Sequence, residues 1–263
     1  MAKIVGWFYN RWLSFRYFVR AIGGICALIL YSTRNYIIDK KGRDQVNTII
    51  TMQIYFTGVM AITIISVVAL ALGAITILQA FTQLSKVGAL DLVGKLLNIV
   101  IVRELGPVFT AFIVLSRSGT AIAAEIGTMM VNDEVNALEM QGIDTLKFIV
   151  FPRIVGMVVA LVLLNIYFTT LSLVGGFVVA NAIGGVSYEL FFEYVFNSIT
   201  LMDIFSSFLK CVVFGMFIAT VSVFHGFQAF VSTQIPQVTT KAVMSSIIAL
   251  FVLDALLTVV FYI

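Results

Sequence analysis

Long apolar runs separated by short polar segments dominate the chain, and they predict a bundle of membrane-spanning helices. A helix needs about 20 consecutive apolar residues to cross the hydrocarbon core of a bilayer. The first run, 45–85, carries no charge and is too long for one span, so we interpret it as one spanning helix with a helical or interfacial continuation to Phe81. The five predicted spans are Thr48–Leu72, Lys95–Ser116, Ile154–Ala180, Ile204–Phe227 and Lys241–Ile263.

Two segments between these spans have the pattern of short amphipathic helices. In residues 117–153, Val131, Val135 and Leu138 recur at helical spacing, and acidic side chains occupy the rest of the turn. A helix that rests on a bilayer usually carries Lys or Arg on its polar face, whereas this face is acidic. The pattern therefore favours docking into a groove on a partner protein. The second segment, Ser187–Ile199, has two glutamates and several aromatic residues but no Lys or Arg, which suits the non-cytoplasmic interface.

Composition and charge place the chain in a membrane and orient it. Of its 263 residues, 61% are hydrophobic and 11% are charged, against about 25% charged residues in a soluble domain. Eight of the 16 Lys and Arg residues precede residue 44, which places the N-terminus in the cytoplasm by the positive-inside rule. The same segment, 1–44, is rich in aromatic residues, so it predicts an interfacial amphipathic helix rather than an arm that binds nucleic acid. Five spans then place the C-terminus outside.

Four charged side chains lie within the predicted spans. A charge at the centre of a membrane costs about 2.5–3.5 kcal/mol on insertion scales, so such a residue needs a partner or a function. Arg103, Lys210 and Asp254 fall at similar depths when residues are counted from the outer ends of their helices, and we predict a structural ion pair between Lys210 and Asp254. Arg103 and Glu104 point about 100° apart on a helix, so at least one of them faces a cavity, a partner subunit or a headgroup. A functional and a structural role both stay open for this pair.

Several common catalytic and binding motifs are absent from the sequence. It has no glycine-rich phosphate-binding loop of the ATPase type, no His-Glu-x-x-His pattern and no Gly-x-Ser-x-Gly pattern. Cys26 and Cys211 lie far apart in apolar stretches, which predicts buried thiols rather than a disulfide or a metal site. The single histidine, His225, has no Cys or His neighbour, and we interpret it as a helix-end or interfacial residue. We therefore expect neither an enzyme nor a bound metal.

One block of motifs resembles a known family. Its members are, in order, Arg103-Glu104-Leu105-Gly106-Pro107-Val108, Ser116-Arg117-Ser118-Gly119, Ala124-Glu125-Ile126-Gly127-Thr128-Met129, Glu134, Gly142-Ile143-Asp144 and Pro152-Arg153. In this block, in its length and in its five-span plan, the chain resembles the MlaE/YrbE permeases, the membrane subunits of MCE-type ABC lipid transporters. It departs from the family pattern at Thr145, where Pro is common, and at Ser116 and Ser118, where Gly or Ala is commoner.

The resemblance implies a homodimeric permease with a cytoplasmic ABC ATPase dimer and a ring of MCE-domain proteins on the periplasmic side. ATP and Mg²⁺ would be bound by the ATPase, and no cofactor by this chain. The helix around Glu125–Gln141 would dock on the ATPase as a coupling helix. The residues expected to contribute to this coupling are Arg117, Glu125, Gly127, Val131, Glu134, Val135 and Leu138.

The resemblance also implies a lipid cavity at the dimer interface. Arg103, Glu104 and Pro107 are the candidates to line or gate this cavity. Arg103 would bind a phosphate or another anionic headgroup through its planar guanidinium group. Glu104 would balance the charge of Arg103 when the site is empty.

These observations predict an all-α membrane protein that forms a single permease domain over 1–263, with a basic interfacial region at 1–44 and a transmembrane core at 45–263. The predicted function is to move phospholipid or a related lipid between the bacterial inner membrane and an MCE-domain partner. The alternative is a secondary transporter or channel that uses the four intramembrane charges as an ion relay. That alternative predicts activity without ATP and no stable cytoplasmic partner. Neither the lipid species nor the direction of transport follows from the sequence.

Overall fold

The computed structural model describes residues 29–34, 36, 43–86, 88, 92–184 and 187–262, and within these ranges the regular elements are helices, without strands. Five helical stretches there are long and apolar enough to cross a membrane, which confirms the predicted number of spans. These stretches are Arg43–Lys86, Val93–Val131, Leu146–Ile183, Leu201–Gly226 and Ser232–Tyr262. The interfacial helix predicted for 1–44 lies, for most of its length, outside the described residues.

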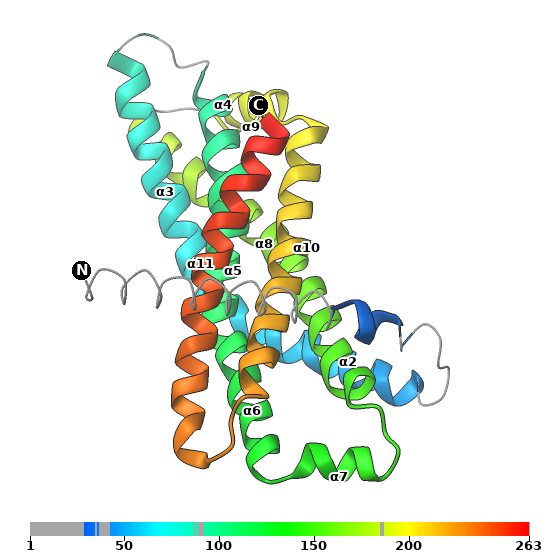
Figure 1. Ribbon diagram of the computed structural model, residues 1–263. Helices are drawn as coiled ribbons and strands as arrows, with labels where there is room; N and C mark the ends of the chain where they lie inside the picture. Colours follow the sequence, from blue (N-terminus) through cyan, green and yellow to red (C-terminus); the bar gives the residue numbers. More distant parts are fainter. Residues whose placement is uncertain are drawn as a thin grey trace, which may run out of the picture.

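The first stretch differs from its prediction because it bends. α2 (Arg43–Gly58) runs across the bundle and α3 (Ile62–Lys86) runs along it, with a 3₁₀ turn, η1 (Val59–Ala61), between them (Figure 1). α3 alone has 25 residues, which is enough to cross the hydrocarbon core. The spanning helix of this stretch therefore begins near Ile62 rather than at Thr48.

The second stretch is one helical rod that contains two π-helical segments. It consists of α4 (Val93–Leu97), η3 (Asn98–Leu105), α5 (Gly106–Val114), η4 (Leu115–Gly119) and α6 (Thr120–Val131). Its 39 residues extend about 58 Å at 1.5 Å per residue, well beyond a hydrocarbon core of about 30 Å. The predicted span, Lys95–Ser116, has the length that fits a bilayer, and α6 continues the rod past its end.

The remaining helices follow the predicted order, with shifted ends. They are α7 (Glu134–Met140), η5 (Leu146–Val150), α8 (Phe151–Gly184), α9 (Tyr188–Ser198), α10 (Leu201–Gly226), η6 (Ser232–Gln234) and α11 (Ile235–Tyr262). α11 begins ahead of the predicted Lys241, because Pro236 is compatible with a first helical turn, where the N–H group has no intrahelical partner. α7 and α9 lie at opposite ends of the bundle, and the C-terminus lies at the α9 end (Figure 1). We name the two ends of the molecule after these helices.

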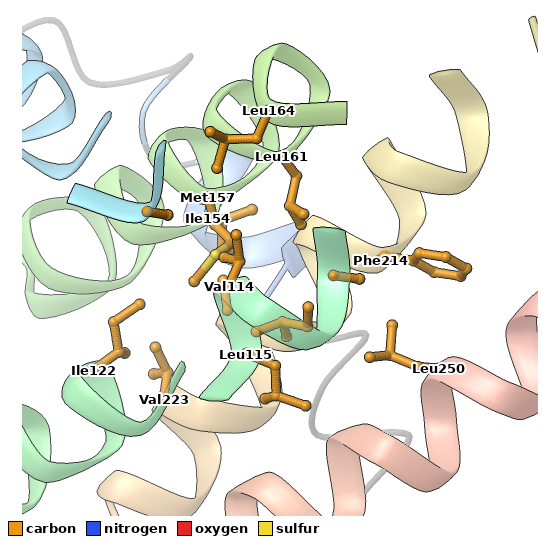
Figure 2. Packing of buried hydrophobic residues seen from close by; sticks show 14 of the residues in the cluster. Val114, Leu115, Ile122, Ile154, Met157, Leu161, Leu164, Phe214, Val223 and Leu250 are labelled. Atoms are coloured by element: carbon orange, nitrogen blue, oxygen red, sulfur yellow. The ribbon is translucent and has the colours of Figure 1, made fainter. Parts of the chain in front are cut away.

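Two clusters of buried apolar side chains pack the helices together. In the larger one, Val114 of α5, Met157 of α8 and Phe214 of α10 are fully buried, and α11 adds further side chains (Figure 2). The smaller cluster packs α9, through Phe191, against α3, α4 and α8. Because lipid is as apolar as these side chains, close packing stabilises helix contacts within a membrane. Gly73 shows how close the packing is, since a Cβ atom there would collide with the backbone of α8.

Candidate functional site

The charged side chains predicted within the spans lie together where the second, fourth and fifth spans meet. Lys210 of α10 is fully buried at the centre of this charged group. Its Nζ lies 2.9 Å from Oε2 of Glu104 and 2.8 Å from Oδ1 of Asp254. Nζ also donates to Oγ1 of Thr258 at 2.9 Å, and this hydroxyl donates to Oε1 of Glu104 at 3.1 Å. The structure thus brings Lys210 and Asp254 together and adds Glu104 as a second carboxylate.

Pro107 contributes to the charged group through the backbone. In an α-helix, the N–H of residue 107 would donate to the carbonyl of Arg103, but proline has no N–H. The Arg103 carbonyl accepts a hydrogen bond from Nζ of Lys210 instead, at 3.1 Å. Pro107 itself is buried at the start of α5, directly after the π-helical segment η3. π-helical segments of this kind often occur at functional sites.

Arg103 is held by a different carboxylate from the one predicted. Its Nε lies 2.7 Å from Oδ1 of Asp203 on α10, and its guanidinium carbon lies 4.1 Å from the centre of the Tyr262 ring. Glu104, expected to balance the charge of Arg103, pairs with Lys210. The Arg103 side chain is 22% exposed, and in the part of the chain that the structure describes its two terminal amino groups have no ion-pair partner. Of the two cations in the group, Arg103 is therefore the one that a ligand can reach.

The sequence prediction does not include Asp203, although the sequence carries a signal for it. Asp203 is fully buried in the first turn of α10, and its carboxylate accepts a hydrogen bond of 2.9 Å from the backbone N–H of Thr200. Thr-x-x-Asp ahead of an apolar run is the pattern of a capping box. Nδ2 of Asn98 donates to the same carboxylate at 2.7 Å. Asp203 therefore caps α10 and holds Arg103 at the same time.

The segment predicted as a coupling helix is divided between two helices. α6 ends at Val131, and α7 begins at Glu134 after a turn in which Asp133 has a φ of 57°. Beyond α7, Gly142 has a φ of 75°, which suits glycine, and the N–H of Ile143 bonds back into the last turn of α7 at 3.0 Å. This arrangement is a Schellman motif. It fixes α7 as a short helix with a defined end.

Two apolar side chains of α7, Val135 and Leu138, face the bundle. Val135 is 6% exposed and packs, together with Leu138, in the larger core cluster. The exposed face carries Glu134 and Met140, and Met140 is 90% exposed. A partner protein would therefore meet the face opposite to the one indicated by the spacing of Val131, Val135 and Leu138.

The other residues predicted to contribute to coupling lie outside α7, on η4 and α6. Arg117 donates to the backbone carbonyl of Phe56, in the last turn of α2, at 3.3 Å. Glu125 pairs with Arg153 at the start of α8, with 2.8 Å between Oε1 and Nη2. Gly127 lies beside the segment that leads into α11. These positions join the second span to its neighbours near the α7 end.

No group of three or more His, Cys, Asp or Glu side chains with the geometry of a metal site occurs among the described residues. Cys211 is a fully buried free thiol within α10. Nε2 of His225 lies 3.2 Å from Oγ of Ser245, close to the end of α10, as a helix-end residue would. Neither side chain belongs to the charged group.

Comparison with known proteins gives a family match over most of the chain. The family model described as Permease MlaE matches residues 50–260. The chain is 30% identical to the intermembrane phospholipid transport system permease protein MlaE of Haemophilus influenzae over 216 residues, which cover 81% of this chain and 83% of that protein. It is 31% identical to a probable ABC transporter permease protein of Synechocystis over 207 residues, 78% of each chain. It is also 26% identical to the chloroplast protein TRIGALACTOSYLDIACYLGLYCEROL 1 of Arabidopsis thaliana, over 80% of this chain and 60% of that protein.

Proposed function

The chain belongs to the MlaE permease family, and from this premise we propose that it is the permease subunit of an ATP-driven lipid transporter. It moves phospholipid or a related lipid between the inner membrane and an MCE-domain partner on the periplasmic side. The observation that carries the proposal is the family match over 50–260, which includes the charged group and α7. Because the relatives are named as permease subunits of transport systems, the chain is a transport subunit rather than an enzyme.

In this proposal the α9 end faces the periplasm and the α7 end faces the cytoplasm. The excess of Lys and Arg before residue 44 supports this orientation, and so does the lack of Lys and Arg in Ser187–Ile199. A second copy of the chain completes a lipid cavity beside the charged group. Arg103 presents its terminal amino groups to the lipid phosphate, because Asp203 engages the Nε edge of the guanidinium group. Lys210, which is fully buried, holds three helices together.

The ABC ATPase binds ATP and Mg²⁺ and docks on the exposed face of α7. Met140 and Glu134 are exposed on this face, and a short helix that presents an apolar and an acidic side chain suits docking into a groove on a partner protein. Val135 and Leu138 connect the other face of α7 to the core cluster between the spans. A displacement of α7 by the ATPase would therefore be transmitted into the packed core.

Purification from native membranes in mild detergent, followed by proteomics and lipid mass spectrometry, tests this proposal. We expect an ABC ATPase, an MCE-domain protein and phospholipid to accompany the chain. Met140→Asp should release the ATPase, because it places a charge on the docking face in place of an exposed apolar side chain. Met202→Asp is the matched control, since Met202 is exposed at the α9 end and its substitution should leave the ATPase bound. Recovery of the chain without any ATPase would contradict the proposal.

The linked charges around the buried Lys210 favour an ion relay as a second candidate function. Glu104, Lys210 and Asp254 are linked by contacts of 2.8 and 2.9 Å, and such linked groups can pass protons or ions within a membrane. The relay predicts transport by the purified chain alone in vesicles under an ion gradient. Transport that requires the ATPase and stops when ATP is omitted would exclude it.

A further inference from the structure

A second cationic site lies at the other end of the bundle, in a cavity of about 380 Å³ between α2, η4, α6 and α8. Arg117, Arg153 and Glu125 line it together with Gln53 and the apolar side chain of Met52. Its volume falls within the range of about 300–1,000 Å³ that small-molecule sites occupy. The cavity lies about 20 Å along the second span from the charged group, so it is a separate site.

The cavity contains one more cation than carboxylates. Nη2 of Arg153 lies 2.8 Å from Oε1 of Glu125, which offsets its charge. Arg153 is 6% exposed and donates to the carbonyl of Ile149 at 2.7 Å, but its Nε has no hydrogen-bond partner. Within the described residues Arg117 has no carboxylate partner, and it donates to the carbonyl of Phe56 at 3.3 Å. An unneutralised guanidinium group and an unpaired buried N–H both favour an anionic ligand.

The cavity lies at the depth of lipid headgroups. α9 packs on α4 at one end of the second span, and with α9 at the periplasmic surface, as proposed above, Leu97 lies close to that surface. Arg117 follows about 20 residues later, roughly 30 Å along the rod, which is the thickness of the hydrocarbon core. α2 crosses the bundle there and exposes Met52, Tyr55 and Phe56 (Figure 1). Exposed aromatic and apolar side chains on a crosswise helix are typical of the membrane interface.

We propose that this cavity binds the phosphate of a phospholipid headgroup from the leaflet at the α7 end. Arg117 makes the bidentate contact, and Nε of Arg153 supplies a further donor, because planar guanidinium groups match the geometry of phosphate oxygens. Met52 and Phe56 provide an apolar wall for the first part of the acyl chains. A free phosphate shares the anionic chemistry but has no acyl chain to place against that wall.

This second headgroup site adds a lipid-binding step to the proposed transport. Its binding of lipid can be measured without transport. If α7 faces the cytoplasm, as proposed above, the site receives lipid from the inner leaflet, and Arg103 lies nearer the outer surface. The chain then holds one headgroup site towards each surface of the membrane. Binding to the purified chain requires no ATPase and no MCE-domain partner, so a failure of either idea can be recognised separately.

Native mass spectrometry of the full chain in detergent, titrated with dioleoylphosphatidylglycerol, tests the site. Arg117→Gln should weaken one lipid-binding step about 10- to 100-fold, which is the loss expected for charge-assisted hydrogen bonds, and should leave any step at Arg103 unchanged. Lys241→Gln is the matched control, because it removes an exposed cation near the same end of the bundle and should leave binding unchanged. Equal losses in the two variants would overturn the proposal, since they would indicate attraction by overall charge.

Two further measurements keep the result interpretable. Ala121→Leu fills the cavity without changing its charge, and it should weaken lipid binding even if Arg117→Gln does not fold. Unchanged binding in Ala121→Leu would overturn the proposal. Inorganic phosphate added to the lipid-bound chain distinguishes the two sources of the anion. We expect it to leave the lipid bound at equal concentration, and displacement of the lipid would assign the site to free anions instead.

Discussion

Lys210 offers the most direct test of the charged group, because two carboxylates from other helices share its one ammonium group. Lys210→Met keeps an unbranched apolar stem of four heavy atoms and removes the terminal ammonium group. The oxygens of Glu104 and Asp254 lie 2.9 and 2.8 Å from Nζ, so they are no more than about 5.7 Å apart. At that separation and an effective dielectric constant of about 20, two unit charges repel by about 3 kcal/mol. Removal of one partner from a buried pair costs about 3–5 kcal/mol in other proteins, which agrees with this value.

We therefore expect Lys210→Met to lower the free energy of unfolding by about 3–5 kcal/mol. Equilibrium unfolding in mixed detergent micelles, followed by circular dichroism, measures this change. Lys95→Met is the matched control, because Lys95 is exposed, and its effect should stay within about 0.5 kcal/mol. Combining Lys210→Met with Glu104→Gln and Asp254→Asn should recover most of the loss, because the repulsion is removed. The reasoning is refuted if Lys210→Met costs no more than Lys95→Met.

Three further predictions concern packing and helix ends, and the same unfolding assay measures them. Gly73→Ala forces a methyl group against the backbone of α8 and should cost about 1–3 kcal/mol, whereas Gly58→Ala, whose new Cβ would meet its nearest neighbour at 3.9 Å, should be close to neutral. Gly142→Ala should cost about 1 kcal/mol, because its φ is 75°, and hydrogen exchange should show faster opening of α7. Thr200→Ala should cost about 0.5–2 kcal/mol through the lost cap of α10, and Asp203→Ala should cost more, because it also leaves an arginine unpaired. Equal losses at these two positions would contradict the ion pair.

The number of spans can be predicted from the sequence, because the length of an apolar run measures what the hydrocarbon core requires. The bend between α2 and α3 cannot be predicted in the same way. No charge and no run of polar residues marks the change of direction near Gly58, and the bend depends on how α2 packs against α8. A charged residue is a similarly poor marker of a helix end. The predicted second span ends just ahead of Arg117, but the helix continues through η4 and α6 to Val131.

The depth of the charged side chains in the membrane can be predicted from the sequence, but their ion-pair partners cannot. Counting residues along each helix brings Lys210 and Asp254 to one level, since the rise per residue is constant. The choice of partner depends on how each helix is rotated about its axis, which a single sequence does not reveal. Glu104 therefore pairs with Lys210 rather than with its neighbour Arg103. The ion pair of Asp203 is not predicted for another reason. An acidic residue in the first turn of a helix is expected as part of its cap, so the sequence gives no sign of a second role.

Arg103 and Arg117 share a feature that connects the two proposed headgroup sites. Each lies within a π-helical segment of the same rod, Arg103 in η3 and Arg117 in η4. The wider π-helical turn changes the direction of the side chains relative to a regular α-helix, and such turns are frequent at functional sites. α6 joins this rod to α7, on which the ATPase is proposed to dock. The helical segments that connect α7, Arg117 and Arg103 are stiff, so a displacement of α7 would act first on Arg117 and then on Arg103. This gives the proposed transporter a physical route from nucleotide binding to both lipid sites.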